Sequence, residues 1–280
     1  MIIDGTTIAK QILQKTKRKV TLLKKKGIIP HLGIILVGND PRSAVYIRGK
    51  EKAALDAGIK FTLFPFPQNI TEKKLIDSIT TIQKKHKLTG LIVQLPLPEH
   101  LYTPHILNAI NPTIDIDCLT HENMGRLIMK WGELYPPTAA AVMEVIDSLR
   151  IDLPGKHVVI VGAGALVGKP LAIMLINARA TVTICNSATK DIQKTCKSAD
   201  IVVSGVGKKD LIRGNMIKPG AVVIDTGICF ENNKLYGDVN LKEVAKKASA
   251  VTPTPGGIGP ITIAKLLQNT VLCAEKKNHR

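Results

Sequence analysis

Val158-Val-Ile-Val-Gly162-Ala-Gly164-Ala-Leu-Val-Gly168-Lys-Pro170 is the stretch of sequence that indicates the fold most clearly. An uninterrupted run of β-branched residues is typical of a central strand in a parallel sheet. The glycines that follow predict a tight turn into a helix, where backbone N–H groups can meet a pyrophosphate. Because Gly168 falls four residues after Gly164 instead of three, the spacing departs from the usual dinucleotide fingerprint. A tight turn that binds no ligand is therefore the competing interpretation.

The same alternation of short β-branched runs and longer helical patterns extends over the whole chain and predicts an α/β protein with mostly parallel strands. Strands are expected at residues 32–37, 61–64, 91–94, 158–161, 181–185, 201–204, 221–225 and 250–252. Helices are expected at residues 7–26, from about Ser43, and at 72–85, 104–110, 140–149 and 261–275.

We expect two domains. Residues 1–140 would form an N-terminal α/β substrate domain, to which the helix within 261–280 returns, and residues 141–260 a C-terminal Rossmann-like parallel-sheet dinucleotide-binding domain.

Length and composition limit the class of protein. The chain has 280 residues, of which 45% are hydrophobic and 22% charged, as in ordinary globular proteins. No apolar stretch reaches the roughly 18–20 residues that span a bilayer, and no secretory signal pattern is present, so we expect a cytoplasmic protein without a membrane partner. Five cysteines without a C-x-x-C pair, and seven histidines without ligand spacing, predict reduced thiols and no metal site.

A net charge of +17 is the unusual bulk property, and it raises the question of nucleic-acid binding. The lysines, however, occur in short groups at the ends and polar faces of predicted helices, where they favour solubility. Aromatic residues make up only 3%, so the stacking platforms of single-strand binders are scarce. We expect no nucleic-acid partner, whereas a small anionic substrate or cofactor would gain from the same positive field.

Polar residues of the first half form a candidate catalytic group. Tyr46 and Lys50 are four apart on a predicted helix, so both can reach one point, where a shielded lysine can exchange protons near neutral pH. Gln94 ends an apolar strand, where α/β sheets tend to place ligand groups. Asp115 and Asp117 lie in a loop, where a carboxylate could accept hydrogen bonds from the N–H groups of a flat heterocycle. The competing interpretation is a solvated lysine beside a half-buried tyrosine, with aspartates that only form a turn.

Seven segments, taken together and in order, resemble the bifunctional methylenetetrahydrofolate dehydrogenase/cyclohydrolase family. They are Tyr46-x-x-x-Lys50, Val93-Gln-Leu-Pro-Leu-Pro98, Asp115-x-Asp117, Ala180-Thr-Val-Thr-x-Cys185, Gly220-Ala-Val-Val-Ile-Asp225, Gly237-Asp-Val239 and Thr252-Pro-x-Pro-Gly-Gly-Ile-Gly-Pro260-x-Thr262. The segments span nearly the whole chain.

The resemblance implies a homodimer of two-domain chains with folate in the cleft between the domains. It further implies oxidation of 5,10-methylenetetrahydrofolate to the methenyl form with NAD(P), followed by hydrolysis to 10-formyltetrahydrofolate. The implied catalytic residues are Lys50 as acid/base, Tyr46 and Gln94 as its tuning and placing partners, and Asp117 as the residue that holds the pterin. The implied substrate-binding residues are these four with Leu95, Pro255, Gly256 and Gly257. The implied cofactor-binding residues are Gly162, Ala163, Gly164, Val167, Ser187, Gly207, Ile228 and Thr262.

Departures from the family pattern leave alternatives open. Ala163 stands where the family commonly has an arginine for the 2′-phosphate of NADP, and Asn186 stands where an acidic residue would bind the ribose of NAD, so NADP is the family expectation and NAD remains open. Cys118 replaces the usual glycine after Asp117, and Pro136-Pro-Thr-Ala-Ala-Ala141 replaces the usual Pro-Cys-Thr-Pro-x-Gly. The alternatives are a monofunctional NAD-dependent dehydrogenase and a homologue that binds folate or nucleotide without catalysis.

Overall fold

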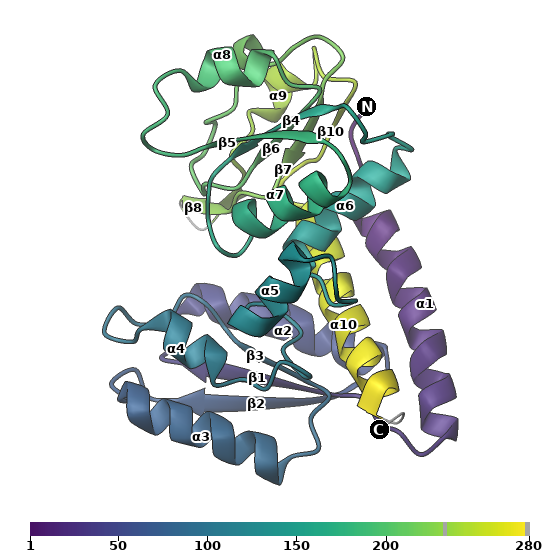
Figure 1. Cartoon of the computed structure of the whole chain (residues 1–280), viewed down its shortest axis with the longest axis vertical. Helices are drawn as coiled ribbons and strands as arrows, with labels where there is room; N and C mark the ends of the chain where they lie inside the picture. Colours follow the sequence, from purple (N-terminus) through teal and green to yellow (C-terminus); the bar gives the residue numbers. More distant parts are fainter. Residues whose placement is uncertain (232–233, 278–280) are drawn as a thin grey trace. The chain divides into compact units, whose positions relative to one another are not determined.

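The computed structural model describes residues 1–231 and 234–277, apart from the side chain of Arg42. Two compact units form, one from residues 10–137 and 263–280, and the other from residues 1–9 and 138–262. We call them the first and the second unit. Both are built on parallel sheets (Figure 1), which confirms the predicted α/β class. No helix in the described ranges is long and apolar enough to cross a membrane.

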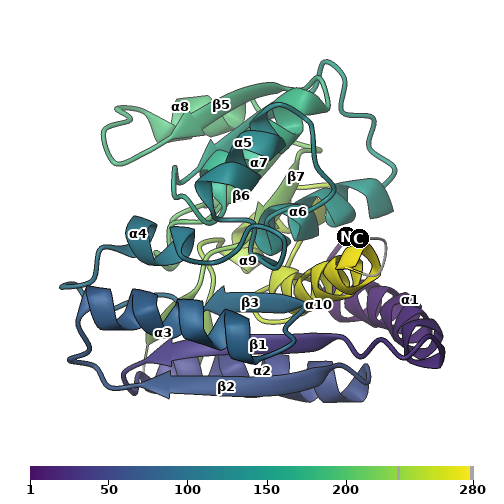
Figure 2. The same cartoon turned by 60° about the horizontal axis from the view of Figure 1, so that its bottom comes forward.

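The first unit contains a three-stranded parallel sheet in the order β2-β1-β3. Its elements are α1 (Gly5–Lys25), β1 (His31–Val37), α2 (Pro41–Asp56), β2 (Lys60–Phe66), α3 (Glu72–Lys85), β3 (Gly90–Val93), α4 (Thr103–Asn108), α5 (His121–Ile128) and most of α10 (Ile258–Lys277). One face of the sheet packs on α1, α2 and α10, and the other on α3 and α4 (Figure 2). Since β1 pairs with β2 on one side and with β3 on the other, the strand order reverses between β1 and β3. Parallel sheets tend to bind ligands at such a reversal point.

The second unit contains a five-stranded parallel sheet in the order β10-β7-β6-β4-β5. Its elements are α6 (Pro137–Ser148), β4 (His157–Val161), α7 (Gly168–Asn177), β5 (Thr181–Cys185), α8 (Ile192–Lys197), β6 (Ile201–Ser204), the 3-10 helix η1 (Gly214–Met216), β7 (Val222–Asp225), β8 (Cys229–Glu231), β9 (Lys234–Tyr236), α9 (Leu241–Val244) and β10 (Ala250–Val251). The residues of β4 that follow His157 are buried, as expected for a central strand. Here the order reverses between β4 and β6.

The chain is divided differently from the sequence-based expectation at its beginning. Residues 1–9 were assigned to the first domain, but they belong to the second unit, where the backbone N–H of Ile3 donates to Val251 O at 2.9 Å and that of Gly5 donates to Gly256 O at 3.0 Å. The N-terminus thus pairs with β10. Helix α6 begins at Pro137 rather than at residue 140, and α10 begins at Ile258 rather than at 261.

Candidate active site

Helix α2 presents Tyr46 and Lys50 one turn apart. The Lys50 ammonium donates a hydrogen bond of 3.0 Å to Gln94 Oε1. Gln94 directly follows β3, its backbone N–H donates to Ile35 O of β1 at 2.8 Å, and its side-chain amide donates to Leu95 O at 2.8 Å. Both polar atoms of the Gln94 side chain, Oε1 and Nε2, are therefore hydrogen-bonded. Gln94 thus holds the Lys50 amine at the reversal point of the sheet.

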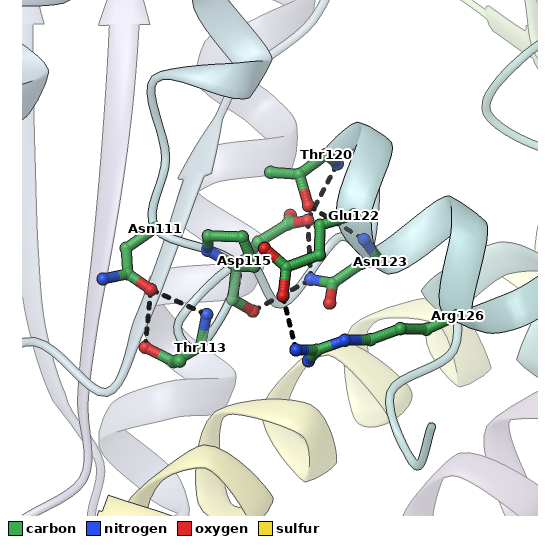
Figure 3. Close-up of polar contacts among 8 residues, drawn as sticks. Asn111, Thr113, Asp115, Thr120, Glu122, Asn123 and Arg126 are labelled. Carbon is green, nitrogen blue, oxygen red and sulfur yellow. Dashed lines mark hydrogen bonds and ion pairs between the residues drawn. The ribbon is translucent and has the colours of Figure 1, made fainter. Parts of the chain in front are cut away.

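The two loop aspartates have different surroundings. Asp115 is buried, and its Oδ2 accepts hydrogen bonds from the Thr120 backbone N–H at 2.9 Å and the Asn123 side-chain amide at 3.0 Å (Figure 3). It therefore fixes the start of α5, where Thr120 is the N-cap. The described residues donate no hydrogen bond to the carboxylate of Asp117, which is partly exposed. Of the two, Asp117 is therefore the carboxylate better placed to accept hydrogen bonds from a ligand.

Burial and charge shift the protonation equilibria of this group. Burial lowers the pKa of Lys50, and the negative charge of Asp117 partly opposes that shift. Burial raises the pKa of Asp117 to about 6, the Lys50 ammonium counteracts the rise, and Asp115 adds to it. Burial also raises the pKa of Tyr46. A lysine that gives up its proton more readily than usual is suited to acid/base chemistry near neutral pH.

The hydroxyl oxygen of Tyr46 is buried and has no hydrogen-bond partner among the described residues. A buried hydroxyl without a partner is costly, so a polar group that binds there would be favoured. The tyrosine lies on the same helix as Lys50, which is the position that the sequence predicts for a shared reaction centre.

Cys118 occupies a backbone conformation that favours glycine. Its φ is +58°, in the left-handed region, and its side chain is buried with Sγ 3.4 Å from Leu134 O. Burial raises the pKa of this thiol. The cysteine in place of the family's usual glycine therefore adds backbone strain next to Asp117 and leaves an inert, protonated sulfur in the core.

The glycine turn of the second unit is tightly packed on one side and open on the other. Gly162 has φ of +114°, and a Cβ at that position would lie 2.7 Å from Gly205 O. A Cβ on Gly168 would lie 1.9 Å from Gly162 O, so the unusual third glycine lets the start of α7 close over the turn. Gly164 is exposed, with no neighbour within 4 Å of an added Cβ. This cradle fits a pyrophosphate, because backbone N–H groups can approach it without side chains in the way.

The other residues predicted to bind the nucleotide follow the carboxyl ends of β4, β5, β6 and β7. Ser187 is exposed after β5, and Ile228 is 42% exposed after β7. Asn186 Oδ1 accepts the backbone N–H of Ala188 at 2.9 Å, so this oxygen closes a turn. Ala163 and Val167 are half-buried, and Gly207 has φ of +79°.

Thr262 lies on α10 and belongs to the second unit. Its hydroxyl donates to Ile258 O at 3.2 Å and approaches the Thr138 hydroxyl at 3.5 Å.

The predicted substrate loop also belongs to the second unit. Pro255 is exposed, whereas Gly257 is buried and a Cβ there would lie 2.4 Å from Pro253 O. Gly256 O accepts from the Gly5 backbone at 3.0 Å. These two glycines therefore have a packing role within the second unit.

Asn269 was not singled out from the sequence. It is buried on α10, and its side-chain amide donates to Ile116 O at 2.8 Å and to Tyr135 O at 2.9 Å. It thus anchors the backbone immediately before Asp117. A buried asparagine inside an apolar helix is the signal that could have identified it.

All five cysteines are free thiols, and no group of three or more His, Cys, Asp or Glu side chains in the described ranges is placed to hold a metal ion.

The fold and the site define an α/β protein in which one unit carries a dinucleotide turn and the other a shielded lysine site. Comparison with known proteins agrees with this class. Residues 3–117 match the family described as "Tetrahydrofolate dehydrogenase/cyclohydrolase, catalytic domain", and residues 136–278 match the "NAD(P)-binding domain" of the same family. The chain belongs to the tetrahydrofolate dehydrogenase/cyclohydrolase family, which confirms the resemblance stated above.

Individual relatives cover almost the full length. The bifunctional protein FolD of Nautilia profundicola is 46% identical over 98% of this chain and 97% of that protein. The crystal structure of the bifunctional enzyme FolD of Campylobacter jejuni is similar with a TM-score of 0.96 and 40% identity, over 99% of both chains. The methylenetetrahydrofolate dehydrogenase-cyclohydrolase of Trypanosoma brucei, complexed with NADP and an inhibitor, gives a TM-score of 0.95 at 38% identity, over 100% of this chain and 98% of that one.

Proposed function

We propose that this chain oxidises 5,10-methylenetetrahydrofolate to the methenyl form with a nicotinamide dinucleotide and hydrolyses the product to 10-formyltetrahydrofolate, with Lys50 as the acid/base. The family supports both activities. The observation that carries the role of Lys50 is its amine, which is shielded enough to lower its pKa and is held by Gln94 Oε1 at 3.0 Å.

In the oxidation, the substrate loses a hydride from the methylene carbon that bridges its two nitrogens. The nicotinamide ring, when bound, accepts that hydride. Asp117 would hold the pterin by accepting hydrogen bonds from its N–H groups, because Asp115 is already engaged with Thr120 and Asn123. The Tyr46 hydroxyl, which lacks a protein partner in the described part of the chain, would bind a polar group of the folate.

In the hydrolysis, water attacks the methenyl carbon, which carries positive charge. The neutral Lys50 amine would take one proton from this water, and the resulting ammonium would return a proton to the ring nitrogen that leaves as the ring opens. The other proton of the water would pass to solvent as the hydroxyl on the former methenyl carbon becomes the formyl carbonyl. A lowered pKa increases the fraction of neutral amine available for the first step. Gln94 would keep the amine directed at the reaction centre in both protonation states.

The nucleotide would bind at the Gly162 turn with its pyrophosphate over the exposed Gly164. The family is an NAD(P)-binding one. An NAD-preferring dehydrogenase is the second candidate, and it is favoured by Ala163, which offers no positive charge to the 2′-phosphate of NADP. We also propose that the chain works as a homodimer in the cytoplasm. Light scattering of the purified protein would test the oligomeric state.

Two absorbance assays test the function. The first follows formation of the methenyl product from methylenetetrahydrofolate with NADP and, separately, with NAD. The second follows disappearance of the methenyl product with nucleotide omitted. Activity in both supports the bifunctional proposal, oxidation with NAD alone and no hydrolysis supports the second candidate, and a folded protein inactive in both overturns the two together.

A further inference from the structure

Two buried aspartates at the carboxyl end of the five-stranded sheet have no part in the reaction described above. Asp225 is the last residue of β7, and Asp238 lies between β9 and α9. Both are almost completely buried. Because a carboxylate is removed from water only where hydrogen bonds compensate, the bonds that these two accept indicate what they hold in place.

The Asp238 carboxylate binds the residues at the end of β6. Its Oδ2 accepts from the Ser204 hydroxyl at 2.7 Å and from the Val206 backbone N–H at 2.7 Å. Its Oδ1 accepts from the Lys208 backbone N–H at 2.7 Å. These are the short distances of charge-assisted hydrogen bonds. One side chain therefore shapes residues 205–208, which we call the β6 loop.

Asp225 holds the backbone of Asp238 in turn. It accepts from the backbone N–H groups of Gly227 at 2.9 Å, Asp238 at 3.1 Å and Val239 at 3.0 Å. Two glycines make room for the pair: a Cβ on Gly237 would lie 1.9 Å from Asp225 Oδ2, and one on Gly227 would lie 2.1 Å from Asp238 Oδ1. The segment 237–239 is thereby fixed as the support of the β6 loop.

The β6 loop lies directly against the proposed nucleotide site. Gly205 O is 2.7 Å from the position of a Cβ on Gly162, and Val167 Cγ1 is 3.9 Å from that of a Cβ on Gly205. Ile228 O is 3.2 Å from that of a Cβ on Gly207. In addition, the loop and the Gly162 turn follow β6 and β4, between which the strand order reverses. Such a reversal point is where parallel sheets bind nucleotides.

We propose that Asp238 is a positioning residue for the dinucleotide, because its carboxylate holds the β6 loop against the Gly162 turn before any ligand binds. Asp238 itself is fully buried and acts only through Val206, Lys208 and Ser204. This inference rests on the proposed function in one respect, namely that the turn and the loop bind the nucleotide.

The test compares two Asp→Asn variants of the same unit. Asp238→Asn keeps the size of the side chain but replaces one acceptor by an NH2 group, so a backbone N–H of the β6 loop loses its partner. Asp200→Asn is the matched control. Asp200 also accepts a backbone N–H, from His157 at 3.0 Å, and a Lys218 ammonium at 2.7 Å, but it lies at the opposite, amino end of β4 and β6.

Three measurements on the full chain distinguish a positioning role from general destabilisation. They are hydrogen exchange of the amides in 205–208 without ligand, the Kd for NADP and NAD by titration, and methenyl hydrolysis with nucleotide omitted. For Asp238→Asn we expect faster exchange in the loop, a rise in Kd of at least about tenfold for the preferred nucleotide, and hydrolysis close to that of the wild type. For Asp200→Asn we expect wild-type Kd values and loop exchange.

A wild-type Kd in the Asp238→Asn variant overturns the inference, and so does unchanged exchange in the loop. If that variant does not fold, Ser204→Ala removes a single one of the three bonds, and a rise in Kd of about two- to fivefold is expected, whereas an unchanged Kd overturns the inference. Failure of the wild type to bind either nucleotide overturns the proposed function instead, and it is detected before any variant is made.

Discussion

Replacement of Lys50 by methionine separates the two activities. Methionine keeps an unbranched apolar side chain of similar length and removes the titratable amine. General acid/base catalysis contributes about 10²–10⁴ in rate, so methenyl hydrolysis should fall by at least about 100-fold, equivalent to about 2.7 kcal/mol of transition-state stabilisation. Hydride transfer moves no proton, and therefore the dehydrogenase rate should fall less than the hydrolysis rate.

The effect of Lys50→Met on stability is expected to be small because two contributions oppose each other. The lowered pKa of Lys50 means that the folded chain disfavours the ammonium at neutral pH, so its removal relieves a cost. The same change removes the donor to Gln94 Oε1 and the positive charge that lowers the pKa of Asp117. We expect a net change in the free energy of unfolding within about 1 kcal/mol.

The assay should be carried out near pH 8. Without Lys50 the pKa of Asp117 rises above its value of about 6, and a higher pH keeps the carboxylate ionised. Lys52→Met is the matched control, since Lys52 is exposed on the same helix. Hydrolysis at the wild-type rate in a folded Lys50→Met protein would refute the assignment of Lys50, and an equal loss in Lys52→Met would show that the effect is not specific to the site.

Four further predictions follow from individual residues. The Michaelis constant for folate should rise as the pH falls through about 6, because protonation of Asp117 removes the acceptor, and Asp117→Asn should abolish that dependence in a pH series. Ala163→Arg should lower the Michaelis constant for NADP more than that for NAD, and an unchanged ratio in paired kinetics would mean that another residue holds the 2′-phosphate. Cys118→Val should lower the free energy of unfolding by about 2 kcal/mol in urea, since a β-branched residue is disfavoured at φ of +58°, whereas Cys118→Gly should stay within about 1 kcal/mol of the wild type. Asn269→Leu leaves two carbonyls without their donor, so it should cost about 2–4 kcal/mol and raise the Michaelis constant for folate; stability equal to that of the wild type would contradict this role.

Local signals account for the elements that the sequence predicts well. Helix α3 has the predicted bounds, because Thr71 caps its start, accepting from the Lys74 backbone at 3.4 Å, and lysines occupy its last turn. Strands β5 and β6 also coincide with their predicted ranges. Helix α5 and the β8–β9 hairpin were missed, because α5 has only eight residues and the hairpin strands three each, too few for a periodic pattern.

The site was predictable as far as its residues lie close in the sequence or match the family pattern. The pair Tyr46 and Lys50 follows from helical spacing alone. Asn269 stands out as a polar residue in an apolar helix, but its partner Ile116 is 153 residues away, and no local pattern in one sequence identifies that contact. For the same reason the sequence does not predict the pairing of residues 1–3 with β10.

The backbone donors around each carboxylate decide what that carboxylate does. Asp115 and Asp238 accept hydrogen bonds from N–H groups, a side-chain amide or a hydroxyl of their own unit, and a buried carboxylate engaged in this way stabilises a loop. Asp117 is held close to Lys50 without such donors among the described residues, so burial raises its pKa to about 6. Two residues of the same type, separated by Ile116 alone, thus differ in their surroundings because α5 begins beside one of them and not the other, and this difference supports the role in folate binding that we propose for Asp117. Substitution of Thr120 or Asn123 would therefore act on Asp117 through Asp115, so that the start of α5 supports the proposed folate site.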